Sequence, residues 1–387
     1  MSVHRLEFHP LTFVEERDGI TVGRPDADSY AMLPEDGAAL LRRLSEGMPV
    51  PEAADWYRTE FGESIDMDDF VEALHELGFI REAGESVVVA KEVGLQWLGR
   101  AMFSPLALSG YAVLVAAALI VLVMQPELRP HAANVFFTSS LVAVQLVLTF
   151  AQVPVLVVHE GFHVLAGRRL GLPSKLSLGR RLYFIVVQTE LDGLLGVPRR
   201  KRYLPFLAGM LADVLVFSLL TIGSAVLGPN LLGRLALAVA YLVVLRFVWQ
   251  FYVFLRTDLY YVLTTMLGCT NPHEATMAYL RGKFGWLPGV QPSTSDSADW
   301  SPRDRQLVPW FAALTVAGVG FLLVTIAIAI VPVVLGFAVR TWTALAQGAS
   351  AGAEFWDSAV SVLLIVIQAV LLIVVSRRGS SSRKETA

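Results

Sequence analysis

From residue 106 onward, long apolar runs alternate with short polar stretches. A run of about 20 apolar residues is long enough to cross a bilayer as a helix. The second and fourth runs exceed one simple crossing, so we expect them to tilt, kink or emerge, with Pro154 as the kink point in the second. We predict six membrane spans, at residues 106–124, 135–166, 204–227, 231–267, 307–339 and 355–376.

The first 90 residues follow a different pattern. Apolar residues on both sides of the turn sequence RDG (17–19) predict a short hairpin, and SYAML predicts another brief strand. Three short helices are then expected, starting at Pro34 and Pro51 and capped by Asp66, each with acidic residues in its first turn. The segment 79–90 is expected to return as a terminal wing. This order of elements predicts a winged-helix-like domain.

The predicted fold is therefore a polytopic α-helical membrane protein with a small N-terminal α+β winged-helix-like domain. A polar stretch that contains a short helical pattern separates the last two spans from the others. The predicted segments are the N-terminal domain at 1–90, a linker at 91–105, a membrane core at 106–267, a cytoplasmic loop at 268–306, two further spans within 307–376 and a basic tail at 377–387.

Composition agrees with a membrane protein and excludes a single soluble globule, because 55% of the residues are hydrophobic and 17% are charged. Charge is divided unevenly. Residues 1–90 contain 7 Arg, no Lys and 20 acidic residues, whereas the rest of the chain contains 24 basic and 14 acidic residues. A domain with a net charge of −13 would repel phosphate, so we expect no nucleic-acid partner. The single cysteine, Cys269, excludes an intrachain disulfide framework.

Basic residues predict the orientation of the spans. Nine Lys and Arg lie between residues 168 and 202, so this loop is expected in the cytoplasm. With six spans, both termini are then cytoplasmic, and the polar start MSVHRLEFHP agrees because it lacks the apolar core of a signal peptide. The loops that contain Arg129 and Arg340 would then lie on the non-cytoplasmic side, as exceptions to the rule that basic loops are cytoplasmic. We expect a multi-pass protein of the inner or plasma membrane, in contact with lipid.

One span carries three ionisable side chains, His159, Glu160 and His163, in the sequence VVHEGFHVLAG. Helical positions i and i+4 share a face, so the two imidazoles can point at one metal ion. In this HExxH arrangement Glu160 stands beside the metal, where it can take a proton from water. The pattern predicts zinc as cofactor and Glu160 as the catalytic residue of a metal-assisted hydrolysis. The alternative is a hydrogen-bonded cluster that packs helices in a protein without catalysis.

Zinc held by two histidines needs a third protein ligand and leaves its fourth position to water. Asp192 lies in the basic loop, just before PRRKR, and is expected outside the bilayer. Asp213 is nine residues into the third span, and Asp258 is near the cytoplasmic end of the fourth. Their estimated depths along the helices do not show which of the two is the third ligand. Asp213 and Asp258 therefore stay rivals.

Residues 135–270 resemble the site-2 protease family of intramembrane zinc metallopeptidases. The resemblance rests on HEGFH within a span, on the Gly-x-x-x-polar pattern from Gly209 to Asp213 in the next span, and on Asp258 in a later one. It implies that Asp258 completes the metal site, and that Asp213 packs helices or positions substrate. The family usually has Asp-Gly at this point, whereas Leu259 follows Asp258 here, so Asp213 is kept as the rival ligand.

Other residues of this region are candidates for contacts with substrate or with the developing oxyanion. Arg246 and Arg256 lie on the same predicted span as Asp258 and could instead pair with the carboxylates. For Arg256 the alternative is snorkelling to the interface. Gly209 is a further candidate contact. The β-rich run 182–187 could hold an extended peptide by backbone pairing, or form an amphipathic re-entrant element.

Residues 5–90 resemble the PqqD-like domains that recognise precursor peptides in ribosomal peptide biosynthesis. The matching stretches are SYAMLPEDGAALLRRLSEG, the helix that ends in EFG, and DMDDFVEALHELGFI. The resemblance implies capture of an extended leader peptide along a sheet edge. The alternative is a solvated regulatory domain without a ligand.

Together these expectations describe a zinc endopeptidase that cuts a peptide or membrane segment near the cytoplasmic face. A leader-binding domain joined to a protease suggests leader removal or maturation of a ribosomally made, modified peptide. Two other functions stay open. One is a non-hydrolytic membrane module that binds peptides for export or immunity, and the other is regulated intramembrane proteolysis of a signalling protein.

Overall fold

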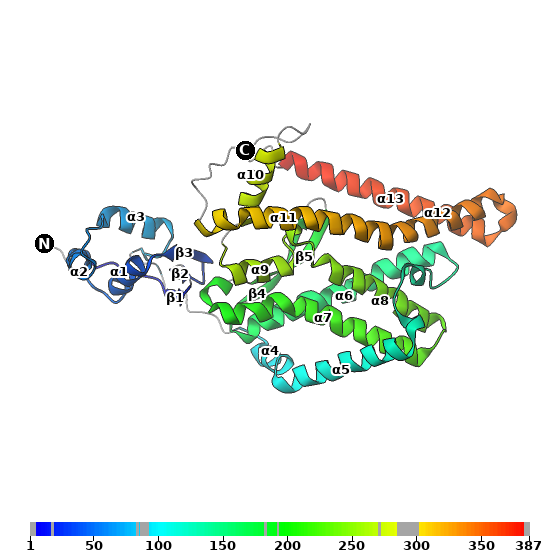
Figure 1. Ribbon diagram of the computed structural model, residues 1–387, viewed down its shortest axis with the longest axis horizontal. Helices are drawn as coiled ribbons and strands as arrows, with labels where there is room; N and C mark the ends of the chain where they lie inside the picture. Colours follow the sequence, from blue (N-terminus) through cyan, green and yellow to red (C-terminus); the bar gives the residue numbers. More distant parts are fainter. Residues whose placement is uncertain are drawn as a thin grey trace. The chain divides into compact units, whose positions relative to one another are not determined.

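The computed structural model describes residues 5–16, 19–82, 85, 93–181, 184–191, 193–269, 272–284 and 302–382 (Figure 1). The chain divides into two compact units. The N-terminal unit comprises Met1–Arg100, Val164–Lys175 and Glu190–Pro205, and the membrane unit comprises Ala101–His163, Leu176–Thr189 and Phe206–Ala387.

The N-terminal unit contains a three-stranded antiparallel sheet in the order β1-β2-β3. Val22 of the central strand pairs with Phe13 on one side and Ala31 on the other, and it is completely buried. Gly19 ends the first turn with φ +150°, where a side chain would meet the backbone of β3. The predicted hairpin and brief strand are confirmed, although residues 17–18 of the turn lie outside the described residues. The strands are β1 (Thr12–Glu15), β2 (Ile20–Arg24) and β3 (Ser29–Leu33).

Three helices follow the sheet where the sequence predicts them. Asp66 caps the third, because its carboxylate accepts hydrogen bonds from the backbone N–H groups of Asp68 and Asp69. The Tyr57 hydroxyl donates to the Asp36 carboxylate and joins the second helix to the first. This bond raises the pKa of Tyr57 to about 12. The helices are α1 (Glu35–Ser45), α2 (Val50–Phe61) and α3 (Met67–Glu76).

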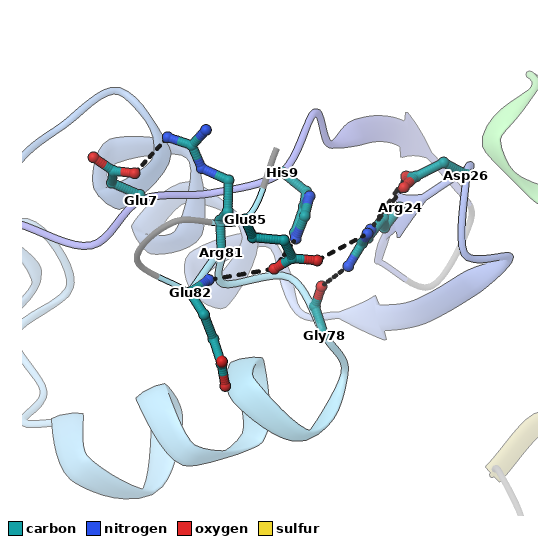
Figure 2. A network of polar contacts seen from close by, with 8 residues as sticks. All are labelled: Glu7, His9, Arg24, Asp26, Gly78, Arg81, Glu82 and Glu85. Atoms are coloured by element: carbon teal, nitrogen blue, oxygen red, sulfur yellow. Dashed lines mark hydrogen bonds and ion pairs between the residues drawn. The ribbon is translucent and has the colours of Figure 1, made fainter. Parts of the chain in front are cut away.

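A polar network joins the start of the chain to the end of α3 (Figure 2). The Arg24 guanidinium donates to the Asp26 carboxylate and to the Gly78 carbonyl oxygen. The buried His9 ring has its Nε2 3.3 Å from Oε2 of Glu85. These contacts hold the chain that leaves α3 against β2.

The predicted wing at 79–90 lies mostly outside the described residues. Of this segment the structure describes residues 79–82 and 85. A single antiparallel bridge joins Ile80 to Phe8. The small sheet with three helices is observed, whereas the winged-helix form stays a prediction.

The N-terminal unit also includes the segment before α7 (Arg199–Leu227) and the first residues of that helix, up to Pro205. Glu16 accepts ion-pair contacts at 2.7 Å from Nε of Arg199 and at 2.7 Å from a terminal nitrogen of Arg202. The exposed fractions of the Glu16 and Arg202 side chains are only 5% and 7%. Asp28 accepts a hydrogen bond from the backbone N–H of Gly193 at 3.0 Å. The sheet and the segment 193–202 are therefore packed together.

Six helices of the described chain are long and apolar enough to cross a membrane, which indicates a multi-pass membrane protein. Their exposed faces are rich in large apolar side chains, as expected of surfaces that contact lipid. The six are α5 (Pro105–Met124), α6 (Leu141–Arg169), α7 (Arg199–Leu227), α8 (Leu231–Trp249), the continuous run Arg303–Ala346, and the first part of α13 (Ala353–Ser382).

The fourth predicted span, 231–267, is broken, in line with the expectation that it tilts, kinks or emerges. Helix α8 ends at Trp249, and the chain passes through a 3-10 turn, η4 (Val253–Leu255), before it restarts as α9 (Asp258–Leu267). Side-chain hydrogen bonds stabilise the break. The Gln250 side-chain oxygen accepts the backbone N–H of Asp258 at 3.1 Å, and the Thr257 hydroxyl donates to the Gln250 carbonyl at 2.7 Å.

Other spans also differ from their predicted limits, and α7 begins five residues earlier than predicted, at Arg199. Helix α6 begins at Leu141, because the Ser140 hydroxyl accepts the N–H of Ala143 and the Asp357 carboxylate accepts the N–H of Leu141. The fifth run has 44 residues, or about 66 Å, which exceeds one perpendicular bilayer crossing. It consists of α11 (Pro302–Thr325), the π-helical turn η6 (Ile326–Ile330) and α12 (Val331–Ala346).

Two strands lie between α6 and α7 in the sequence and form a two-stranded sheet. They are β4 (Ser174–Arg181) and β5 (Phe184–Leu191). The strand predicted at 182–187 is found as β5, with residues 182–183 outside the described residues. The short helix expected in the polar loop is α10 (Pro272–Phe284). The remaining elements are α4 (Gln96–Met102), η1 (Pro126–Leu128), η2 (Ala132–Val135), η3 (Leu194–Gly196) and η7 (Gly348–Ala351).

Candidate metal centre

Helix α6 presents His159, Glu160 and His163 from one turn near its C-terminal end. All three are buried, with exposed fractions of 4%, 8% and 6%. The helix continues through Pro154 without a break, so the i, i+4 spacing keeps both imidazoles on one face.

Asp258 joins the two histidines. Nε2 of His159 and Nε2 of His163 are 3.3 Å apart, and Oδ2 of Asp258 lies 3.3 Å from the first and 3.2 Å from the second. Zinc bonds of about 2.0–2.1 Å in a tetrahedron place ligand atoms about 3.3–3.4 Å apart. The three atoms thus have the spacing of one face of a tetrahedral site, and this group could bind a metal ion.

The break after α8 brings Asp258 to this position. Asp258 is the first residue of α9, so its side chain projects from a helix start. Its Oδ2 is buried and, although the two imidazole nitrogens lie near it, forms no hydrogen bond of good geometry in the described part of the chain. A buried carboxylate oxygen without a donor is costly, and a cation bound at this point would compensate for it.

Asp213 contacts Nδ1 of His159, the ring nitrogen that does not face Asp258 and His163. Its Oδ2 is 3.0 Å from Nδ1 of His159, and the residue is 1% exposed. A carboxylate accepts hydrogen bonds only, so Nδ1 carries the proton and Nε2 turns its lone pair toward Asp258 and His163. Carboxylates that orient metal-binding histidines in this way are common around zinc sites. Of the two rival aspartates, Asp258 lies among the candidate ligands and Asp213 lies behind one of them.

Arg246 of α8 contacts Asp213, with its Nε 3.5 Å from Oδ1. The pairing with a carboxylate foreseen for Arg246 is therefore present. Two carboxylates, those of Asp213 and Asp258, contact the histidines, and the described contacts place Arg246 against Asp213. Within these contacts no cationic side chain faces the buried Oδ2 of Asp258, which is unfavourable unless a bound cation balances its charge.

Gly209 allows α7 to approach the two histidines. A Cβ at this position would lie 2.3 Å from Nε2 of His163 and 2.4 Å from Nε2 of His159. Real Cβ atoms do not approach other atoms so closely. Gly209 therefore faces the centre, and any side chain here would displace the imidazoles or the helix.

Thr189 of β5 is a member of the site that sequence reasoning missed. Its hydroxyl lies 2.8 Å from Oε2 of Glu160. The available signal was weak, because it consisted of a hydroxyl residue shortly after the β-rich run 182–187.

Two other residues that the sequence suggested for the site, Arg256 and Asp192, are not found among the candidate ligands of the described chain. Arg256 ends η4 in the left-handed conformation (φ 57°) and interacts with Tyr260 and His273. Its proposed contact with an oxyanion stays a prediction. Asp192, which is expected outside the bilayer, lies outside the described residues.

Searches with this chain against protein-family models, curated proteins and solved structures give no match.

Proposed function

We propose that this chain is an intramembrane zinc metalloendopeptidase, which cuts a peptide or membrane segment near the cytoplasmic face. The observation that carries the proposal is the convergence of His159, His163 and Asp258, with the buried Glu160 next to His159 on the same helix. Two imidazoles and one carboxylate are a donor set that zinc accepts, with a fourth position left for catalysis. The resemblance to site-2 proteases supports the same reading.

The chain's own residues have distinct roles in this proposal. Bound zinc would supply Lewis-acid activation of water and of the scissile carbonyl group. Glu160 accepts the proton of the attacking water and returns it to the leaving amine. Asp213 keeps His159 in the tautomer that exposes the Nε2 lone pair, and Arg246 neutralises Asp213. Because Arg246 pairs with Asp213, this role is favoured for it over direct contact with an oxyanion.

The N-terminal domain suggests the class of substrate. Strand β3 pairs with β2 on one side, and no strand among the described residues pairs with its other edge, where a peptide strand could be added. The negative charge of the domain favours a leader with basic residues. We therefore propose maturation of a ribosomally made, modified peptide by leader removal, with the leader captured in the cytoplasm.

Cleavage of a precursor peptide tests the proposed chemistry. Co-expression of the full chain with precursors encoded nearby, followed by mass spectrometry, should show a defined cut. Glu160→Gln should slow it by about 10²–10⁴-fold and still bind metal, because the ligands are unchanged. If Glu160→Gln cuts as fast as the wild type, the assignment of Glu160 is wrong.

Metal analysis separates this enzyme from a non-catalytic module for peptide binding, export or immunity. We expect about one zinc per purified chain, and loss of zinc in His163→Ala. A protein that is purified without metal, and whose properties His163→Ala does not change, would contradict the proposal. Binding of leader peptides to the full chain distinguishes peptide maturation from regulated proteolysis of a signalling protein.

A further inference from the structure

The Thr189 hydroxyl can donate to two oxygens of the same residue. It lies 2.8 Å from Oε2 of Glu160 and 3.2 Å from the Glu160 backbone carbonyl oxygen. A hydroxyl group has one proton to donate. The shorter distance and the charge of the carboxylate make Oε2 the better acceptor. The bond joins β5 to α6 across 29 positions of the sequence.

Glu160 needs such a partner because of its place on the helix. Consecutive helical residues differ by about 100° around the axis, so Glu160 leaves α6 in a different direction from His159. Its carboxylate must turn back to reach water beside the two histidines. A bond at Oε2 fixes this rotation and leaves Oε1 to accept a proton.

Thr189 is a suitable support for the carboxylate. Threonine is branched at Cβ, which restricts its χ1 angle, and β5 is paired with β4. Glu160 is only 8% exposed, so bulk water competes weakly for the same oxygen. The Thr189 hydroxyl is therefore held in one orientation, from which it donates to the Glu160 carboxylate.

We infer that Thr189 is a positioning residue that holds the Glu160 carboxylate in the orientation for proton transfer. The inference rests on the proposed function, in which Glu160 is the general base. Because the bond connects a strand to the histidine helix, the orientation of the base depends on where β5 lies. A peptide processed at this centre would therefore react fastest when β5 keeps this position.

Kinetics of two matched variants test the role. Thr189→Val keeps the shape of the side chain and removes the donor, whereas Thr189→Ser keeps the donor. We expect Thr189→Val to lower kcat about 10- to 100-fold with little change in KM or zinc content, and Thr189→Ser to stay within a few-fold of the wild type. Equal kcat in Thr189→Val and the wild type would overturn the inference.

An infrared comparison on metal-free protein tests the bond without activity. The difference spectrum between the wild type and Thr189→Val should contain a shifted carboxylate stretching band. The same comparison between Glu160→Gln and the double variant Glu160→Gln/Thr189→Val should lack it. A band that appears in both comparisons, or in neither, overturns the inference.

The double variant also separates this inference from the proposed function. If Thr189 acts through Glu160, Thr189→Val should not slow the residual reaction of Glu160→Gln further. If Thr189→Val slows the wild type and Glu160→Gln equally, the inference about Thr189 is overturned and the proposed function is not affected. Full activity of Glu160→Gln would instead overturn the proposed function.

Discussion

Asp213 lies in the middle of α7 and Asp258 starts α9, and their carboxylates face different atoms of His159. Asp258 approaches Nε2, where the second histidine also points, and Asp213 approaches Nδ1 on the opposite side of the ring. An imidazole can bind metal through one nitrogen while it donates a proton through the other. The two aspartates therefore have complementary roles at one histidine.

This arrangement predicts unequal effects of two matched substitutions. Asp213→Asn should weaken metal binding about 10- to 100-fold, because the amide orients His159 less well than the carboxylate does. Asp258→Asn should weaken it more, because it replaces a charged ligand by a neutral one. Competition with a chelator, measured on purified variants, gives both affinities. The opposite order would assign Asp213 as the ligand.

At this scale the sequence predicted the residues that local spacing determines. His159, Glu160 and His163 could be placed on α6 because four residues make about one helical turn. The role of Asp213 could not be predicted, because it depends on the rotation of α7 about its axis against α6. Thr189 was missed for a similar reason, since its partner lies 29 positions away on another element.

Among the elements, α7 is the helix whose close approach shapes the centre. Gly209 faces the two imidazoles, and the next residue on the same face after one turn is Asp213. A small residue followed by a carboxylate thus lets the helix come near the histidines and then bond one of them. The same helix contains Gly223, where an added Cβ would meet no other atom within 4 Å.

These two glycines provide a test and its control on one helix. Gly209→Ala should reduce metal affinity and cost about 1–3 kcal/mol of stability, because its Cβ overlaps both imidazoles. Gly223→Ala should leave metal binding unchanged. Chelator competition and thermal unfolding in detergent measure both quantities. Equal metal affinity in the two variants would show that α7 does not pack against the histidines as described.

The elements that the sequence predicted poorly are those whose ends depend on distant partners. Apolar residues continue past Trp249, so hydropathy alone extended the fourth span to residue 267. The break depends on the Gln250 side chain, which accepts the N–H of Asp258 at the start of α9. The start of α6 depends likewise on Asp357, which is 216 positions away. Periodicity identifies a helix, whereas such contacts determine where it ends.

For the whole molecule, the uneven charge of the sequence has a structural counterpart. The first 90 residues are strongly acidic, and the first turn of α7 is strongly basic, with the sequence RRKR. Glu16 lies between Arg199 and Arg202, and Arg202 also donates to two backbone carbonyl groups of its own segment. The opposite charges therefore meet in a nearly buried contact within the N-terminal unit.

Loss of the Glu16 charge should loosen this contact. Removing one partner of a buried ion pair typically costs about 3–5 kcal/mol, because the other charge is left without compensation. Glu16→Gln should therefore increase hydrogen exchange of backbone amides in segment 193–205, measured by mass spectrometry on the full chain. Glu15→Gln is the matched control, because Glu15 is the exposed neighbour in β1. Equal exchange in both variants would show that the ion pairs do not hold the segment to the sheet. If Glu16→Gln alone also impaired precursor cleavage, packing of the domain on this segment would be part of processing, because α7 continues from Arg202 to Gly209 and Asp213.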